Sequence, residues 1–244
     1  MRTLLDVRYA PVTSSVGYLE VPFAEAVTAL DEWRRSLYPV VTVRRLEEAF
    51  PRALHQLEPL TSGARPRELL VAAGSWTAYF DSSLRGTDAP SAISVLSRKL
   101  QCQGLAIDVV PHTIGLPGVR QGRAGAVQFT LFGPLKTGFL NYVRTASVVF
   151  DGSRWVFNAN GTVQAFEEPD AYLARRVRDR FTSEMLERYC HALGVNVFEA
   201  ATYGPRSVLL ESAVTMPANC VAMSLSQAQE WLEIAPGEAE RLPG

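Results

Sequence analysis

The stretch that decides the fold runs from residue 127 to residue 166. It reads VQFTLF (127–132), NYVRTASVVF (141–150), DG (151–152), RWVFNA (154–159), NG (160–161) and TVQAF (162–166). Apolar and polar residues alternate through much of it with the period of two that half-buried β-strands show. Asp-Gly and Asn-Gly pairs supply the positive φ angles of tight turns between antiparallel strands. Two such turns in succession predict a β-meander.

The chain before this stretch contains both helical and strand patterns. A helix is predicted over 23–37, because apolar residues recur at intervals of three and four: Phe23, Val27, Leu30, Trp33 and Leu37. A second helix is predicted from Asp88, a candidate N-cap, to Leu100, with Ile93 and Leu96 on its buried side. Strands are predicted at 16–21, 40–43, 68–72, 76–81 and 105–110, and a hairpin is predicted around Gly74-Ser75.

The chain after the meander is predicted to be largely helical. One helix is expected from Asp170 through Arg180, because acidic residues precede basic ones as the helix dipole favours. Another is expected from Thr182 or Ser183 to Gly194. After a strand at 208–210, the last helix is expected to begin at a capping box formed by Ser226 and Gln229 and to carry Trp231 and Leu232.

Helices at both ends with antiparallel strands between them predict an α+β fold. The expected architecture is an antiparallel β-meander sheet packed with helices from the N-terminal, central and C-terminal regions. Short turns between the strands leave no room for the helical crossovers that a parallel sheet requires. We expect a single compact domain over 1–244, with a subdivision near 111–125 left open.

Composition excludes several classes of protein. The 244 residues are 47% hydrophobic and 20% charged, which is typical of a globular chain and not of a disordered one. The formal net charge of -1 gives no overall field that would attract nucleic acid or an anionic membrane. Lys99 and Lys136 are the only lysines. This preference for arginine suggests a GC-rich bacterial source.

Three features together predict a cytoplasmic protein. Cys102, Cys190 and Cys220 form an odd set, as expected of free thiols in a reducing compartment. The first residues, Met1 to Asp6, reach a charge before any apolar signal segment forms. No run of about 20 apolar residues is present to span a bilayer.

No motif predicts a catalytic, cofactor-binding or metal-binding residue. Gly133 to Thr137 resembles a phosphate-binding loop only superficially, because Leu135 stands where that loop needs glycine before the lysine. Cys102, Asp108 and His112 would lie too far apart along one extended strand to act together. Glu184, Glu187 and His191 share a helical face but need further ligands to hold a metal. The arginines of 175–180 are interpreted as a solvated helix, with Arg175 and Asp179 spaced for an ion pair.

One group of residues has the composition of a protein interface. It comprises Trp76, Tyr79, Asp81, Arg85 and Asp88. The sequence therefore predicts a protein that binds another protein stoichiometrically and occludes its surface, for example an immunity protein that blocks a toxin. No cofactor, nucleic acid or membrane is expected as a partner.

Two alternatives stay open. The first is an enzyme or small-ligand-binding protein with a pocket built from distant loops. Its candidate polar residues are Asp108, His112, Tyr142 and Arg144, which could converge only in the folded chain. The second is a subunit of a homo-oligomer that uses an exposed sheet edge.

Overall fold

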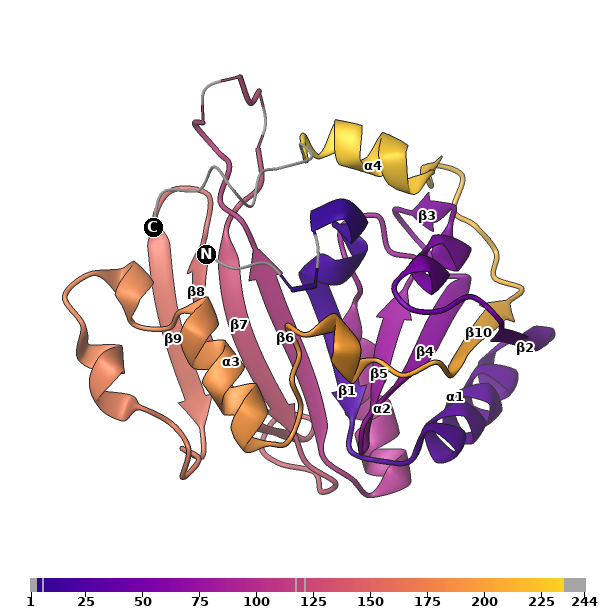
Figure 1. Ribbon diagram of the computed structural model, residues 1–244, viewed down its shortest axis with the longest axis horizontal. Coiled ribbons are helices and arrows are strands. Elements are labelled where there is room, and N and C mark those ends of the chain that lie inside the picture. Colours follow the sequence, from indigo (N-terminus) through magenta and orange to yellow (C-terminus); the bar gives the residue numbers. More distant parts are fainter. Residues whose placement is uncertain (1–3, 6, 117, 121, 235–244) are drawn as a thin grey trace.

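The computed structural model in Figure 1 describes residues 4–5, 7–116, 118–120 and 122–234. Parts of three sequence predictions lie outside these residues. They are residues 1–3 and 6 of the N-terminal stretch, residues 117 and 121 of the subdivision, and residues 235–244 of the expected domain.

One nine-stranded antiparallel sheet organises the described chain. Its strands follow one another in the order β2 (Val41–Leu46), β10 (Ser207–Ser212), β4 (Arg67–Ala73), β5 (Trp76–Asp81), β1 (Ser15–Leu19), β6 (Gly104–Val110), β7 (Ala126–Phe132), β8 (Tyr142–Phe150) and β9 (Trp155–Gly161). A separate small sheet pairs β3 (Leu60–Thr61) with β11 (Ala222–Met223). The α+β prediction is confirmed, and β6 and β7 pair directly although residues 111–125 connect them.

Helices cover both faces of the sheet (Figure 1). On one face, α1 (Phe23–Leu37) and α2 (Ala89–Leu100) bury small and branched side chains. On the other face lie α3 (Ser183–Ala192), α4 (Leu225–Trp231) and the 3₁₀ helix Arg52–Leu57. Among the described residues, no helix combines the length and apolar character needed to cross a bilayer.

Strand β5 shows why two helical layers are present. Trp76, Ala78 and Phe80 point into the core on the α3 side, as the alternation predicts. Tyr79 points to the other side and is buried there beneath the α1 and α2 layer. A central strand covered on both faces keeps the period of two but has no solvent-facing side.

The buried face of α1 joins the sheet through an ion pair as well as through apolar contacts. The Arg34 guanidinium donates two hydrogen bonds to the Glu68 carboxylate on β4, at 2.6 Å from Nε and 2.5 Å from Nη2. The Tyr79 hydroxyl donates a third at 2.6 Å. The two Glu68 oxygens therefore have partners although the side chain is only 1% exposed.

The second predicted hairpin, from Asn160-Gly161 into a strand at 162–166, is wrong. Gly161 is the last residue of β9 and pairs with Arg144 on β8. Its φ is 89°, and a Cβ there would overlap the Val143 carbonyl oxygen. The chain then leaves the sheet, because buried Glu167 accepts hydrogen bonds from Arg144 at 2.8 and 2.9 Å and from Tyr172 at 2.7 Å. The ion pair therefore holds the residues after β9 on the face of the sheet that α3 covers.

The predicted α-helix from Asp170 through Arg180 is also wrong. The segment forms two short 3₁₀ turns, Pro169–Leu173 and Val177–Asp179, and neither has a buried residue. Leu173 is 82% exposed, so the segment has no apolar stripe to hold a helix against the core. Arg175 and Asp179 consequently do not lie one helical turn apart.

The other helices begin and end largely as predicted. In α3, Thr182 is the N-cap and its side chain accepts from the Met185 amide, while Gly194 follows the helix at a φ of 83°. The last helix is displaced by two residues, since its capping box is formed by Ser224 and Gln227. That register buries Leu225 and Ala228, and this burial decides the position of the cap.

Candidate functional site

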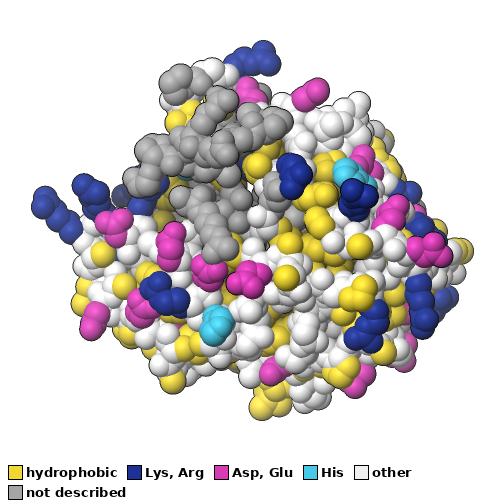
Figure 2. Space-filling view, in the orientation of Figure 1, with side chains coloured by type: hydrophobic (Ala, Val, Ile, Leu, Met, Phe, Trp, Pro, Cys, Tyr) yellow, Lys and Arg dark blue, Asp and Glu magenta, His cyan; other side chains and the backbone are white. Residues whose placement is uncertain are grey.

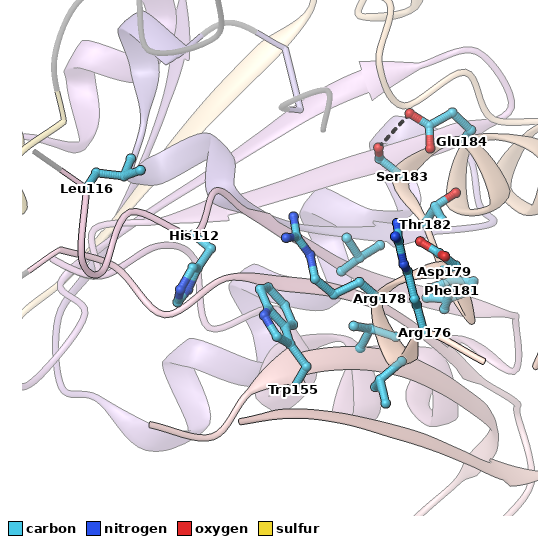
Figure 3. A pocket seen from close by; sticks show the side chains of 13 residues that line it. His112, Leu116, Trp155, Arg176, Arg178, Asp179, Phe181, Thr182, Ser183 and Glu184 are labelled. Atoms are coloured by element: carbon cyan, nitrogen blue, oxygen red, sulfur yellow. Dashed lines mark hydrogen bonds between the residues drawn. The ribbon is translucent and has the colours of Figure 1, made fainter. Parts of the chain in front are cut away.

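A cavity of about 670 Å³ lies between strands β7 to β9 and the segment 176–184 (Figure 3). Three parts of the chain line it. They are His112 and Leu116 from the connection after β6; Val127, Val148 and Trp155 from the sheet; and Arg176, Val177, Arg178, Asp179, Phe181, Thr182, Ser183 and Glu184 from the segment that enters α3. Its volume is within the range of about 300–1,000 Å³ typical of small-molecule sites.

The floor of the cavity is apolar. Val127 and Val148 are neighbours in the register of β7 and β8 and point to the α3 side of the sheet. Phe181, at the entry to α3, is fully buried against the same core. Above this buried floor the lining residues Trp155 and Val177 are partly exposed, and an apolar group in the cavity would displace water from them, which is favourable.

The rings of His112 and Trp155 contact each other and form an aromatic wall of the cavity. The His112 Nδ1 accepts a hydrogen bond from the Gly125 amide at 3.2 Å. Partial burial and the nearby Arg178 lower the pKa of His112, so the imidazole is neutral at pH 7. Because Nδ1 is the acceptor, the proton of this neutral ring is on Nε2, which is then a hydrogen-bond donor.

Trp155 is held in place from several sides. Its ring packs edge-on against His112 at 5.1 Å and against Phe150 at 5.8 Å, measured between ring centroids. The Arg178 guanidinium lies over it at 5.0 Å. Gly125 makes this arrangement possible, because a Cβ there would come within 2.5 Å of the Trp155 ring and 2.6 Å of the His112 Cβ.

Four charged side chains line the cavity: Arg176, Arg178, Asp179 and Glu184. Within the part of the chain that the structure describes, none of the four forms an ion pair. Figure 3 shows the guanidinium groups of Arg176 and Arg178 pointing in the same direction, with that of Arg178 between His112 and Thr182.

The Glu184 carboxylate is kept ionised. Partial burial opposes ionisation, but hydrogen bonds from the Thr182 and Ser183 hydroxyls and from its own amide outweigh it and lower the pKa of Glu184. The Ser183 Oγ donates to Glu184 Oε1 at 3.1 Å (Figure 3). The cavity therefore presents charges of both signs at neutral pH.

The residues predicted to bind a partner do not form one surface. Trp76, Tyr79 and Asp81 are 2%, 1% and 0% exposed. The helices on both faces of the sheet cover these three, so they cannot contact a partner in this fold. Arg85 is exposed and Asp88 is partly exposed, and for these two the interface prediction stays open.

Asp81 and Asp88 have local structural roles. The Asp81 carboxylate accepts hydrogen bonds from the amides of Ser83 at 2.9 Å and Asp88 at 3.0 Å. Burial nevertheless raises the pKa of Asp81 to about 7. Asp88 is the N-cap residue of α2 as predicted, but its side chain bonds to Ser91 and Arg65 and not to the helix amides.

The four residues of the alternative pocket do not converge. His112 lines the cavity. Arg144 pairs with Glu167, and Tyr142 packs on the opposite, α2 side of the sheet. Asp108 lies opposite Ser15 and Gln128 in neighbouring strands, and burial raises its pKa to about 6.

The cysteine and metal arrangements that the sequence analysis considered and did not adopt gain no support. Cys102 and His112 flank opposite ends of β6, and burial raises the pKa of Cys102 to about 11, which disfavours a reactive thiolate. In residues 4–5, 7–116, 118–120 and 122–234 no group of three His, Cys, Asp or Glu side chains is placed to hold a metal ion, and Glu184, Glu187 and His191 form none.

Sequence reasoning missed most of the cavity. It interpreted 175–180 as a solvated helix, and it did not select Trp155, Phe181 or Thr182. The one available signal was the charge-rich run 175–180 without an apolar stripe, placed directly after the meander. Such a run cannot be secured as a helix by burial, but only the tertiary structure shows that it closes over β9.

Figure 2 shows basic and acidic side chains interspersed over the visible face of the molecule, with apolar side chains between them. Comparison with known protein families, curated proteins and solved structures finds nothing that matches this chain.

Proposed function

We propose that this protein binds a small amphipathic organic molecule in the cavity between β7 to β9 and the segment 176–184. One observation carries the proposal: a cavity of about 670 Å³ joins an apolar floor to a polar lining that includes four charged side chains. This division of surface is typical of ligand sites, where apolar walls supply affinity and a few polar groups fix orientation.

The wall of the cavity supports the proposal because it is held in one conformation before any ligand arrives. Contacts from His112, Phe150 and Arg178 restrain Trp155, and the Gly125 amide fixes the His112 ring. A wall that is already ordered loses little conformational entropy on binding. The neutral His112 adds a hydrogen-bond donor beside an aromatic surface.

Binding of anilinonaphthalene sulfonate, an amphipathic fluorescent probe, tests this function. Val177 lines the cavity and is only partly buried, so Val177→Trp should fill the cavity without disturbing the core. We expect saturable binding of the probe by the wild type and an affinity about tenfold lower in the variant, equivalent to about 1.4 kcal/mol.

Two control variants locate the probe. Leu173→Trp adds the same indole at an exposed position that precedes the segment 176–184 and lies outside the cavity, and the affinity of this variant should equal that of the wild type. Phe139→Ser removes an exposed aromatic residue in the β7–β8 connection, which is 70% exposed, and should also leave the affinity unchanged. No saturable binding by the wild type, or equal affinity in Val177→Trp, contradicts the proposal.

A second candidate function, stoichiometric binding of another protein, is favoured by one surface feature. The Arg85 guanidinium lies over the Trp231 ring at 5.1 Å, and Trp231 is 39% exposed. Arginine and tryptophan are the residue types that most often anchor protein interfaces. An immunity protein that occludes a toxin is one protein class with this mode of action.

Direct titration tests this second candidate. The product of a neighbouring toxin-like reading frame is titrated into the wild type, Arg85→Ala and Trp231→Ala. Loss of affinity by at least about 2 kcal/mol in either variant is expected of an anchor residue. Absence of binding by the wild type removes the immunity interpretation. Unchanged affinity in both variants removes this surface as the interface.

A further inference from the structure

The charges around the cavity point to the ligand's chemical class, an inference that rests on the proposed function of the cavity. We propose that the ligand is a zwitterion: a molecule with an oxyanion, a cationic group and an aromatic or branched aliphatic body. Free amino acids with large apolar side chains and short apolar peptides belong to this class. The argument depends on the sign, the number and the pairing of the lining charges.

The lining holds two guanidinium groups and two carboxylates, which cancel. Arg176 and Arg178 supply the positive charges, and Asp179 and Glu184 the negative charges. His112 adds no charge, because burial and Arg178 keep its ring neutral. A ligand with one net charge would be attracted by half of these groups and repelled by the other half, whereas a zwitterion can meet both.

These charges are also available to a ligand. Some other exposed charged residues of this protein form ion pairs with one another, as Arg188 does with Glu168 at 2.7 Å. Among the described residues, the four cavity charges make no such pairs. A guanidinium or a carboxylate that forms no ion pair with another side chain can form a charge-assisted hydrogen bond with a ligand.

The floor indicates the nature of the ligand body. Most of the carbon surface that a ligand can reach belongs to the partly exposed Trp155 and Val177, because Val127, Val148 and Phe181 are at most 5% exposed. An aromatic or branched apolar group would pack against these two side chains. The charged ends of the ligand would then lie toward the segment 176–184, where the guanidinium and carboxylate groups are.

Four probes with the same phenyl body separate the contributions of the two charges. Phenylethanol is neutral, phenylpropanoate carries the oxyanion, phenethylamine carries the cation, and phenylalanine carries both. Their affinities are measured at pH 7 by isothermal titration calorimetry. We expect phenylalanine to bind at least about fivefold more tightly than each of the other three.

Two charge-removing variants assign the groups. Arg178→Gln should weaken phenylalanine and phenylpropanoate but not phenethylamine, because the variant removes a guanidinium that repels the phenethylamine cation. Glu184→Gln should weaken phenylalanine and phenethylamine but not phenylpropanoate, because the variant removes a carboxylate that repels the phenylpropanoate anion. Arg175→Gln is the matched control, because Arg175 directly precedes the segment 176–184, is exposed and does not line the cavity. This control should bind all four probes as the wild type does.

The outcomes separate this inference from the proposed function. Equal or tighter binding of phenylpropanoate or phenethylamine than of phenylalanine overturns the zwitterion. The zwitterion is also overturned if Arg178→Gln and Glu184→Gln change the affinities of all probes equally, or if none of the four probes binds to the wild type. In each case saturable, Val177→Trp-sensitive binding of anilinonaphthalene sulfonate would show that the cavity is still a ligand site. Loss of that binding as well would overturn the proposed function itself.

Discussion

The buried ion pairs and the cavity lining contain the same types of charged side chain, but in the described residues only the buried ones are paired with each other. Glu68 and Glu167 are almost completely buried, and each accepts hydrogen bonds from an arginine and a tyrosine. The four charges that line the cavity are bordered by solvent and form no ion pairs in the described chain. Burial forces a charge to find a partner inside the protein, because an uncompensated charge there is costly.

This difference suggests which charges stabilise the fold and which are available for recognition. Arg34 with Glu68 joins α1 to β4, and Arg144 with Glu167 turns the chain away from the sheet after β9. Their removal should cost stability. Removal of a cavity charge should cost little stability and change binding. The following predictions test this division, from the largest expected effect to the smallest.

The largest effect is expected for Glu68→Gln. The change leaves the Arg34 guanidinium without its counter-charge near the core, and we expect the free energy of unfolding to fall by about 3–5 kcal/mol. Urea denaturation measures the loss. Glu168→Gln is the control, since Glu168 forms a similar two-pronged pair with Arg188 on the surface and should cost at most about 1 kcal/mol. Equal losses would break the division between buried and exposed pairs.

The second effect concerns the buried carboxyl of Asp81. Its pKa is raised from 3.8 to about 7 in the folded protein, so folding favours the protonated form. The resulting stabilisation is complete below about pH 4 and is lost as the pH rises to 7. Asp81→Asn cannot titrate and does not undergo this loss. As the pH rises from 4 to 8, its free energy of unfolding should therefore increase by about 2–4 kcal/mol relative to that of the wild type. Denaturant titrations of both proteins across this range provide the measurement, and a constant difference would contradict the raised pKa.

A smaller effect is expected for Gly125→Ala at the wall of the cavity. The new methyl group would press on Trp155 and His112, and overpacking of this kind costs about 1–3 kcal/mol. Gly138→Ala makes the same change where a Cβ meets nothing within 4 Å, so its stability should stay near that of the wild type. Thermal unfolding compares the two variants. If Gly125→Ala is as stable as Gly138→Ala, the wall adapts and is not held in one conformation.

The smallest effects are expected for Arg176→Gln and Arg178→Gln. Neither guanidinium forms an ion pair in the described residues, and only Arg178 has an aromatic partner, Trp155. We expect each variant to lose at most about 1 kcal/mol of unfolding free energy. Urea denaturation under the conditions used for Glu68→Gln checks this expectation. A loss as large as that of Glu68→Gln would show that these charges serve the fold.

Local patterns in the sequence predicted much of the secondary structure. The hairpins around Gly74-Ser75 and Asp151-Gly152 and the helices over 23–37, 88–100 and 183–192 are present. Each depends on interactions between residues close in the chain, such as a turn residue with positive φ or an apolar repeat. Such patterns are visible in one sequence because their physical causes are local.

Two of the failures have a common cause, which is a long-range contact that outweighs a local signal. The Asn160-Gly161 pair looks like a hairpin turn, but the ion pair between Arg144 and Glu167 directs the chain elsewhere. The capping box at Ser226 and Gln229 is formally correct, but the burial of Leu225 places the cap at Ser224. Gln229 instead donates hydrogen bonds to the carbonyl oxygens of Arg8 and Ala10.

By itself the sequence determined that an antiparallel sheet would be packed with helices, since alternation, turn residues and apolar repeats act over a few neighbouring residues. Only the tertiary structure decided that Tyr79 and Asp81 would be buried and that the segment 176–184 would close a cavity over Trp155. Which face of a strand is covered, and which distant loop meets it, depends on elements that lie far apart in the chain. No local sequence pattern predicts these long-range contacts.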